Sequence, residues 1–228
     1  MQDKVRPSEP LVPPSKSLRL VLLLAFSGGL MDAYSDLGRG GVFANAQTGN
    51  IVLLGVHLTA GNFSAILTYL VPILAFSLGI AAAALLRIRF QRARRVHWRQ
   101  IVVLMEALLF ALVAFLPQDM NLIANSLISL ACGAQVEAFR KVGAQEYGIA
   151  TTMCIGNLRT GVQALSEFAV FRKRDLWRKA CYSFLVILSF ALGAVFCGNL
   201  LLHHWEELSI LTSTAIMLIA FWAMRSRG

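Results

Sequence analysis

The sequence predicts an all-α polytopic membrane protein with six transmembrane helices, two re-entrant or broken helical segments and an inverted-topology internal repeat. Three observations lead to this prediction: the apolar composition, the placement of the basic residues and a series of matching motifs in the two halves. The 228 residues are 57% hydrophobic and only 14% charged. That is far more apolar side chain than a soluble fold of this size needs to bury.

Several apolar stretches are long enough to cross a bilayer, for which a helix needs about 20 residues. They cover residues 18–37, 65–86, 100–116, 120–139, 180–202 and 207–224. Two further stretches, 41–58 and 148–170, are too polar to be counted as spans on composition alone. Residues 1–17 are polar and rich in proline, and we expect a disordered cytoplasmic tail there. Residues 18–228 are predicted to form a single membrane domain.

Matching motifs indicate that this domain consists of two repeats, at about 18–117 and 120–224. In the first match, Gly28, Asp32, Ala33 and Tyr34 align with Gly133, Glu137, Ala138 and Phe139. In the second, Thr48-Gly49-Asn50 aligns with Ile155-Gly156-Asn157. In the third, Ala75–Gly79 aligns with Ser189–Gly193. Each single match could arise by chance in helices rich in glycine and alanine. Three matches in the same order favour a duplication.

The basic residues predict which loops face the cytoplasm. Residues 87–99 contain six arginines and no acidic residue, and residues 171–179 contain five basic residues. Both loops should be cytoplasmic under the positive-inside rule. The loops at 118–119 and 203–207 lack Lys and Arg and should lie on the other side.

This loop assignment decides how the two polar stretches run. If 41–58 crossed the membrane, the loop with six arginines would fall outside. If 41–58 and 148–170 each enter and leave by the same face, every loop obeys the rule and both termini are cytoplasmic. The two halves then run in opposite directions, as in many transport proteins.

The polar motifs resemble those of a known family. They are Asp32-Ala33, Gly41-Val42-Phe43 followed by Asn45 and Thr48-Gly49-Asn50, and, in the second half, the stretch from Gln135 to Arg140 followed by Thr151-Thr152. This pattern is similar to that of the YoaK family of bacterial membrane proteins (DUF1275), over about residues 18 to 224. The resemblance implies a polytopic protein of the bacterial inner membrane and leaves the activity open.

One departure from the family pattern concerns the second polar stretch. Where the family usually has Thr-Gly, this chain has Ile155-Gly156. Either the hydroxyl is dispensable here or the second site has diverged.

The two polar stretches are interpreted as the starts of half-helices. Thr48 and Asn50 are favoured cap residues, and Gly156-Asn157 repeats the arrangement. Such ends would aim free N–H groups into the membrane interior and would bind a polar or anionic solute. The alternative is that these side chains only hold neighbouring helices together. The candidate substrate-binding residues are Asp32, Tyr34, Asn45, Gln47, Thr48, Asn50, Glu137, Arg140, Thr151, Thr152, Asn157 and Arg159.

The carboxylates of the apolar segments are further candidates. Asp32 and Glu137 are aligned near the ends of their helices, where a carboxylate is either functional or solvated by headgroup water. Arg140 is spaced to pair with Glu137. Glu106 lies inside an apolar run and should have a partner such as Arg159 or be protonated.

The leading functional prediction is a transporter or channel for a small polar or anionic solute. The alternatives are a membrane-embedded enzyme that uses Asp32 and Glu137 as acid and base, and a non-catalytic membrane scaffold. No metal, cofactor or catalytic residue is predicted, because the histidines and the cysteines show no ligand spacing. The net charge of +9 sits at the ends of apolar segments, which indicates a lipid bilayer and not nucleic acid as the partner. A homo-oligomer is left open.

Overall fold

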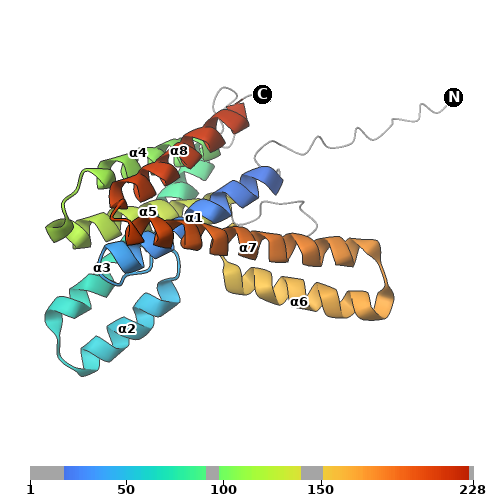
Figure 1. Cartoon of the computed structure of the whole chain (residues 1–228), viewed down its shortest axis with the longest axis horizontal. Helices are drawn as coiled ribbons and strands as arrows, with labels where there is room; N and C mark the ends of the chain where they lie inside the picture. The colour runs from blue at the N-terminus through green and yellow to red at the C-terminus, as the bar shows by residue number, and fades with distance from the viewer. Residues whose placement is uncertain (1–17, 91–97, 140–150, 226–228) are drawn as a thin grey trace.

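The computed structural model describes residues 18–90, 98–139 and 151–225, all of them in helices and short connections (Figure 1). The helices are α1 (Leu18–Gly38), α2 (Gln47–Thr59), α3 (Phe63–Phe90), α4 (Trp98–Ala114), α5 (Asn121–Phe139), α6 (Cys154–Phe171), α7 (Arg174–Leu202) and α8 (Glu206–Arg225), with a short 3-10 turn, η2 (Gln118–Met120), before α5. The prediction of an all-α fold is confirmed within these ranges. The predicted tail, residues 1–17, lies outside them.

Length and apolar composition together separate two groups of helices. Among the described residues, α1, α3, α5 together with η2, α7 and α8 are long and apolar enough to cross a membrane. α4 has 17 residues, which correspond to about 26 Å. α2 has only 13 residues, or about 20 Å, and α6 is not among the candidate spans. The described residues thus contain five candidate spans; α4, which covers the predicted span 100–116, is not among them, and neither are α2 and α6, the helices of the two polar stretches.

The crossing of α3 and α5 brings two backbones into direct contact. A Cβ atom on Gly79 would collide with the carbonyl oxygen of Leu130, and one on Gly133 would collide with that of Phe76. Only glycine fits at such a close approach. In a membrane this packing stabilises the helix pair, since lipid supplies no hydrophobic drive for helix association.

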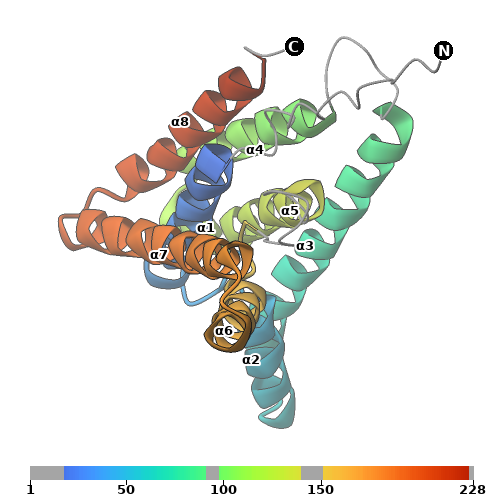
Figure 2. The same ribbon diagram turned by 90° about the vertical axis from the view of Figure 1, so that its right-hand side faces the viewer.

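The crossing of α1 and α7 repeats these contacts with other residues. A Cβ atom on Gly193 would collide with the carbonyl oxygen of Phe26, and one on Gly29 would collide with that of Phe190. α4 and α8 then pack on each other, α4 also on α5, and α8 also on α1 (Figure 2). The contacts that α3 and α4 make with α5 are therefore repeated by α7 and α8 with α1.

The glycine contacts correct the motif alignment by one residue. Gly29, and not Gly28, has the same contacts as Gly133, and these two glycines are 104 residues apart. With this spacing the position that corresponds to Asp32 is Val136. The predicted equivalence of Asp32 and Glu137 is therefore wrong, because a shift of one residue rotates the side chain by about 100° around a helix.

Contacts near the helix ends define the two ends of the bundle. At one end Arg87 of α3 forms an ion pair with Glu137 of α5 at 2.9 Å, and Arg99 of α4 donates a hydrogen bond to the last turn of α5. At the other end the Gln118 amide lies 3.4 Å from the Glu206 carboxylate. The last residues of α3 and the first residues of α4 thus lie at the opposite end of the bundle from the α4–α5 and α7–α8 connections.

A buried arginine joins the end of α1 to the α4–α5 connection. The Arg39 guanidinium donates hydrogen bonds to the Tyr34 hydroxyl at 2.9 Å and to the carbonyl oxygens of Leu116 and Pro117 at 2.8 and 3.0 Å. The next two residues are glycines with φ of +89° and +82°, a conformation that turns the chain where other residues would be strained. The chain then runs back along α1.

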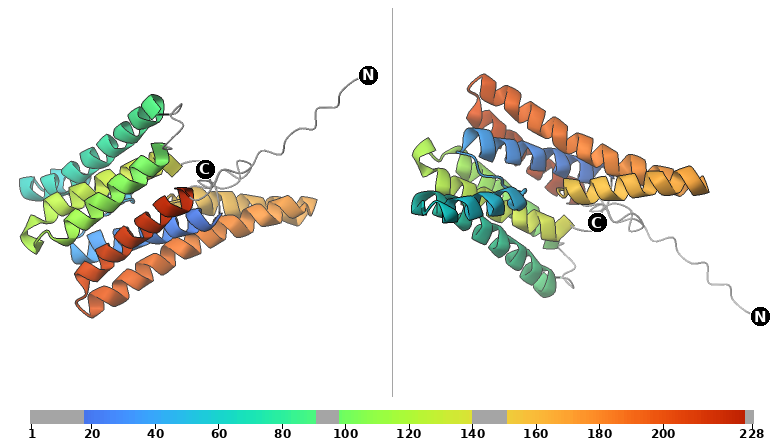
Figure 3. Two further views of the ribbon diagram at one scale, coloured as in Figure 1. Left: turned by 90° about the horizontal axis from the view of Figure 1, so that it is seen from above. Right: turned by 90° about the horizontal axis from the view of Figure 1, so that it is seen from below.

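Two helical hairpins project from the bundle. α2 packs against α3, and α6 packs against α7. The views in Figure 3 show the α6–α7 hairpin extending well past the ends of the other helices. The face that α6 turns to α7 is narrow and includes the small residues Gly161 and Ala164, while Leu158 and Val162 are exposed. Exposed apolar side chains on α6 are suited to contact with lipid.

Candidate functional site

A cavity of about 500 Å³ lies where the N-terminal ends of α2 and α6 meet. Its wall is formed by the first turns of these two helices and by side chains of α1, α3, α5 and α7. Phe76 and Phe190, the residues whose carbonyl groups contact the crossing glycines, both line it. These two phenylalanines were not among the predicted site residues, although their shared Phe-x-x-Gly motif was the available signal.

The segment before α2 reaches far into the bundle. The Asn45 side chain donates to the carbonyl oxygen of Gly28 at 3.1 Å. Gly28 lies ten residues before Gly38, the last residue of α1, which places Asn45 about 15 Å from that end of the helix. The N-terminus of α2 is therefore deep in the molecule.

Amide side chains hold this segment in shape. Asn50 is fully buried; its Nδ2 donates to the Phe43 carbonyl at 2.7 Å, and its Oδ1 accepts the Phe43 N–H at 3.0 Å. Gln47 donates to the Ala44 carbonyl at 2.9 Å. These contacts of Asn50 thus stay within its own segment, and they bear out neither solute binding nor the packing of neighbouring helices. The expected cap at Thr48 or Asn50 is wrong, because the helix begins at Gln47 with Ala46 as its N-cap.

Asp32 supplies a carboxylate to the N-terminal end of α2. It is 7% exposed, and its Oδ1 accepts the backbone N–H of Asn45 at 2.6 Å. A carboxylate near free N–H groups at a helix start is a favourable arrangement, because these groups carry partial positive charge. The positive end of α2 is therefore already paired with an anion from the chain itself.

The N-terminal end of α6 has a different environment. The helix begins at Cys154, with Met153 as an N-cap that makes no side-chain cap hydrogen bond. The expected start at Gly156-Asn157 is wrong by two residues. Thr152 is 8% exposed, and its hydroxyl has no hydrogen-bond partner among the described residues. The Cys154 side chain, in the first turn of α6, lines the cavity.

Five of the predicted site residues line the cavity: Asp32, Asn45, Gln47, Thr48 and Thr152. Thr151 and Asn157 are buried but do not line it, and Arg159 is on an exposed part of α6. Arg140 lies outside the described residues. Tyr34 and Glu137 are engaged elsewhere, in the contacts with Arg39 and Arg87 described above. The two carboxylates of the enzyme alternative, Asp32 and Glu137, therefore do not face a common cavity.

Glu106 is the most isolated carboxylate that the structure describes. It is fully buried in α4, and neither of its oxygens has a hydrogen-bond partner among the described residues. The expected pairing with Arg159 is wrong, since that side chain is on an exposed part of α6. The other alternative, a protonated side chain, stays a prediction.

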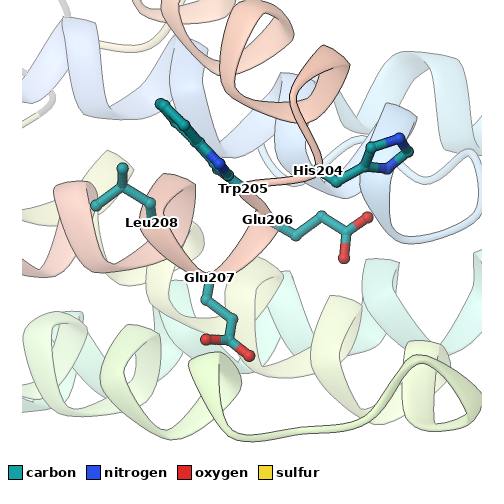
Figure 4. A pocket seen from close by; sticks show the side chains of 5 residues that line it. All are labelled: His204, Trp205, Glu206, Glu207 and Leu208. Atoms are coloured by element: carbon teal, nitrogen blue, oxygen red, sulfur yellow. The ribbon is translucent and has the colours of Figure 1, made fainter.

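A second hollow, of about 390 Å³, lies at the α7–α8 connection. Figure 4 shows the side chains that line it: His204, Trp205, Glu206, Glu207 and Leu208. They come from one continuous stretch: His204 and Glu206 extend to one side, Trp205 and Leu208 to the other, and Glu207 in a third direction. Polar groups that do not converge cannot surround a ligand, so the cavity between α2 and α6 is the better candidate site.

Long apolar helices, short polar helices that begin deep in the bundle and a cavity between them define a multi-pass α-helical membrane protein. Residues 20–223 match the model of a family described as "Protein of unknown function (DUF1275)". The chain is 28% identical over 188 residues to the UPF0700 transmembrane protein YoaK of Bacillus subtilis (strain 168), an alignment that covers 77% of this chain and 80% of that protein. No solved structure matches the chain. The chain belongs to the DUF1275 family, as its motifs predicted.

Proposed function

We propose that the protein is a transporter or channel that passes a small polar or anionic solute through the cavity between α2 and α6. The cavity itself is the observation that carries this proposal. Two helix N-termini from different halves of the chain open into one space of about 500 Å³. Free N–H groups at such ends bind polar and anionic groups. Transporters commonly place their sites at helix ends of this kind.

The proposed topology has six spans, with α4 as the sixth, and two re-entrant helices. α2 starts in the interior and leads into α3, whose last turn lies beside Glu137, at the opposite end of the bundle from the α4–α5 connection. α6 starts at the same cavity and leads into α7, which ends at the opposite connection. The repeated glycine contacts support two halves of inverted orientation. Irregular backbone at this depth is tolerable because it lines a cavity.

The orientation follows from the basic residues. The end of α3 carries Arg87 and Arg89, and the α6–α7 turn carries Arg172, Lys173 and Arg174. The proposal places both groups in the cytoplasm of a bacterium, together with both termini. The α4–α5 and α7–α8 connections then face the opposite side of the inner membrane.

A flux measurement with a blocked cavity tests the proposal. Proteoliposomes receive osmotic gradients of urea, glycine, lactate and choline, and solute entry is followed by stopped-flow light scattering. At least one of these solutes should enter faster than into liposomes without protein. Phe76→Trp should abolish this flux because Phe76 lines the cavity, whereas Phe63→Trp should not, since Phe63 is exposed at the start of the same helix. The same flux with and without Phe76→Trp would contradict the proposal.

Access to the cavity gives a second, independent test. Cys154 is kept and Cys132, Cys181 and Cys197 are replaced by alanine. A membrane-impermeant methanethiosulfonate is then added to one side of the membrane at a time. A pathway for a solute must open to each side in turn, so Cys154 should react from both sides. Reaction from a single side only would overturn the proposal.

A further inference from the structure

We infer that the cavity binds a small organic monoanion, a carboxylate with a short apolar body, and that its carboxylate lies at the N-terminus of α6. This inference rests on the proposed function, because it names the class of solute. It is drawn from a difference between the two helix ends that share the cavity.

The two ends differ at one pair of corresponding positions. Asp32 and Val136 each lie three residues after a crossing glycine, Gly29 and Gly133, and both line the cavity. Asp32 supplies its carboxylate to the segment that starts α2. Val136 can supply no charge to α6. Among the described residues, the first half therefore supplies an anion to its helix end, and the second half supplies none.

The first turn of α6 has free hydrogen-bond donors. The first N–H groups of any α-helix have no acceptor within the helix. Here Met153 adds no side-chain acceptor, and the Asn157 N–H, which donates to the Met153 carbonyl at 3.1 Å, is the first to find a backbone acceptor among the described residues. The N–H groups of residues 154–156 are thus available to a ligand that carries negative charge.

Thr152 points independently to a ligand. This residue is more than nine-tenths buried and lines the cavity beside α6. Its hydroxyl lacks a hydrogen-bond partner among the described residues. A buried hydroxyl without a partner is unfavourable, and such groups usually bind a ligand or water. Its methyl group packs against Gly28, where an added Cβ would lie 2.6 Å away, so the side chain has little freedom to turn elsewhere. A carboxylate oxygen would accept this hydrogen.

The rest of the wall limits the charge and the shape of the ligand. Among the described residues that line the cavity there is no Lys or Arg, so nothing balances a second negative charge. Asp32 would repel a dianion. The side chains of Phe76, Ile80 and Phe190 cover much of the remaining wall. These surfaces suit a short hydrocarbon chain and disfavour a phosphate or a dicarboxylate.

Protection of Cys154 from N-ethylmaleimide measures occupancy of the cavity without any need for flux. In the purified protein that keeps only Cys154, butyrate should slow the labelling about tenfold when its concentration is about ten times its Kd. Butyramide and butylammonium have the same length with no charge and with a positive charge. Both should protect far less at the same concentration and pH.

A matched pair of variants tests the position of the carboxylate. Val136→Asp places a carboxylate where the other half has Asp32, so it should occupy the α6 end and abolish protection by butyrate. Val136→Asn has nearly the same size without the charge and should retain protection. Thr152→Val removes the hydroxyl but keeps the shape, and the butyrate concentration for half-protection should rise about tenfold. Gel filtration shows whether each variant is folded; if Val136→Asp is not, Thr152→Val decides the question.

Each outcome has a defined consequence. Protection by butyramide equal to that by butyrate overturns the inference, and so does full protection in Val136→Asp or an unchanged half-protecting concentration in Thr152→Val. A protein that passes one of the four test solutes but is not protected by butyrate retains the proposed function and loses the proposed solute class. Protection by butyrate without any flux supports the anion site and overturns transport.

Discussion

The half of the molecule that contains α1 to α4 and the half that contains α5 to α8 share their backbone contacts and differ in their polar side chains. Both helix crossings have a glycine pressed against a carbonyl group, and in both halves a short helix begins at the cavity. Among the described residues, only the first half gives that helix a carboxylate, Asp32; the corresponding residue of the second half is Val136. A glycine in close contact with a backbone carbonyl cannot be replaced by a larger residue, whereas a residue in the wall of a cavity can be replaced without moving its neighbours.

The largest effect is expected from the contacts that the halves share. Gly193→Ala would place a methyl group on the Phe26 carbonyl oxygen, and α1 and α7 would have to move apart. We expect a loss of stability of about 3 kcal/mol or more. Gly198→Ala, five residues further along α7, meets nothing within 4 Å and is the matched control. Thermal unfolding in detergent, followed by gel filtration, measures both, and equal unfolding temperatures would refute the packing argument.

Removing the carboxylate should affect the first half alone. Asp32→Ala leaves the N-terminal end of α2 without its acceptor, and we expect a loss of about 2 kcal/mol. Asp32→Asn keeps an oxygen in place and should lose less. Val136→Ala removes only methyl groups at the corresponding position, for a cost of about 1 kcal/mol. The unfolding temperature should be lowest for Asp32→Ala and higher for Asp32→Asn and Val136→Ala. A smaller decrease for Asp32→Ala than for Val136→Ala would show that the α2 end does not need its anion.

Among the described residues, an ion pair is present at one of the two helix crossings and absent from the other, and its removal should cost less stability than the changes above. Arg87 and Glu137 pair at 2.9 Å, with the arginine half-exposed, while the corresponding residues of the other crossing are Leu201 and Ala33. Arg87→Gln should cost about 0.5 to 1 kcal/mol. A double-mutant cycle with Glu137→Gln gives the coupling energy. Coupling of zero would mean that this contact does not help to hold α3 on α5.

The smallest effect is expected at Glu106. A buried carboxylate without partners is costly if ionised, and Gln keeps its shape without that charge. Glu106→Gln should therefore leave the unfolding temperature unchanged or raise it slightly. A clear decrease would show that the carboxylate has an interaction that its surroundings do not reveal.

Much of the fold could be predicted because helices in lipid obey strong local rules. Long apolar runs must be helical, and the polar stretches 41–58 and 148–170 could be recognised as different by composition. The helix starts were missed by one to three residues because the caps are Ala46 and Met153, which carry no capping signal. Some of the predicted site residues, including Asp32 and Thr152, do line the cavity, whereas their role as a binding site stays a prediction.

The sequence by itself determined the membrane class, the helical elements, the two unusual segments and the family, because these depend on composition and local order. Only the tertiary structure decided the register between the halves, the partners of Tyr34 and Glu137, and which polar side chains share the cavity. A shift of one residue turns a helical side chain by about 100°, so motifs that match well along the chain can still face different neighbours. Contacts between helices, and not the matches themselves, set that angle.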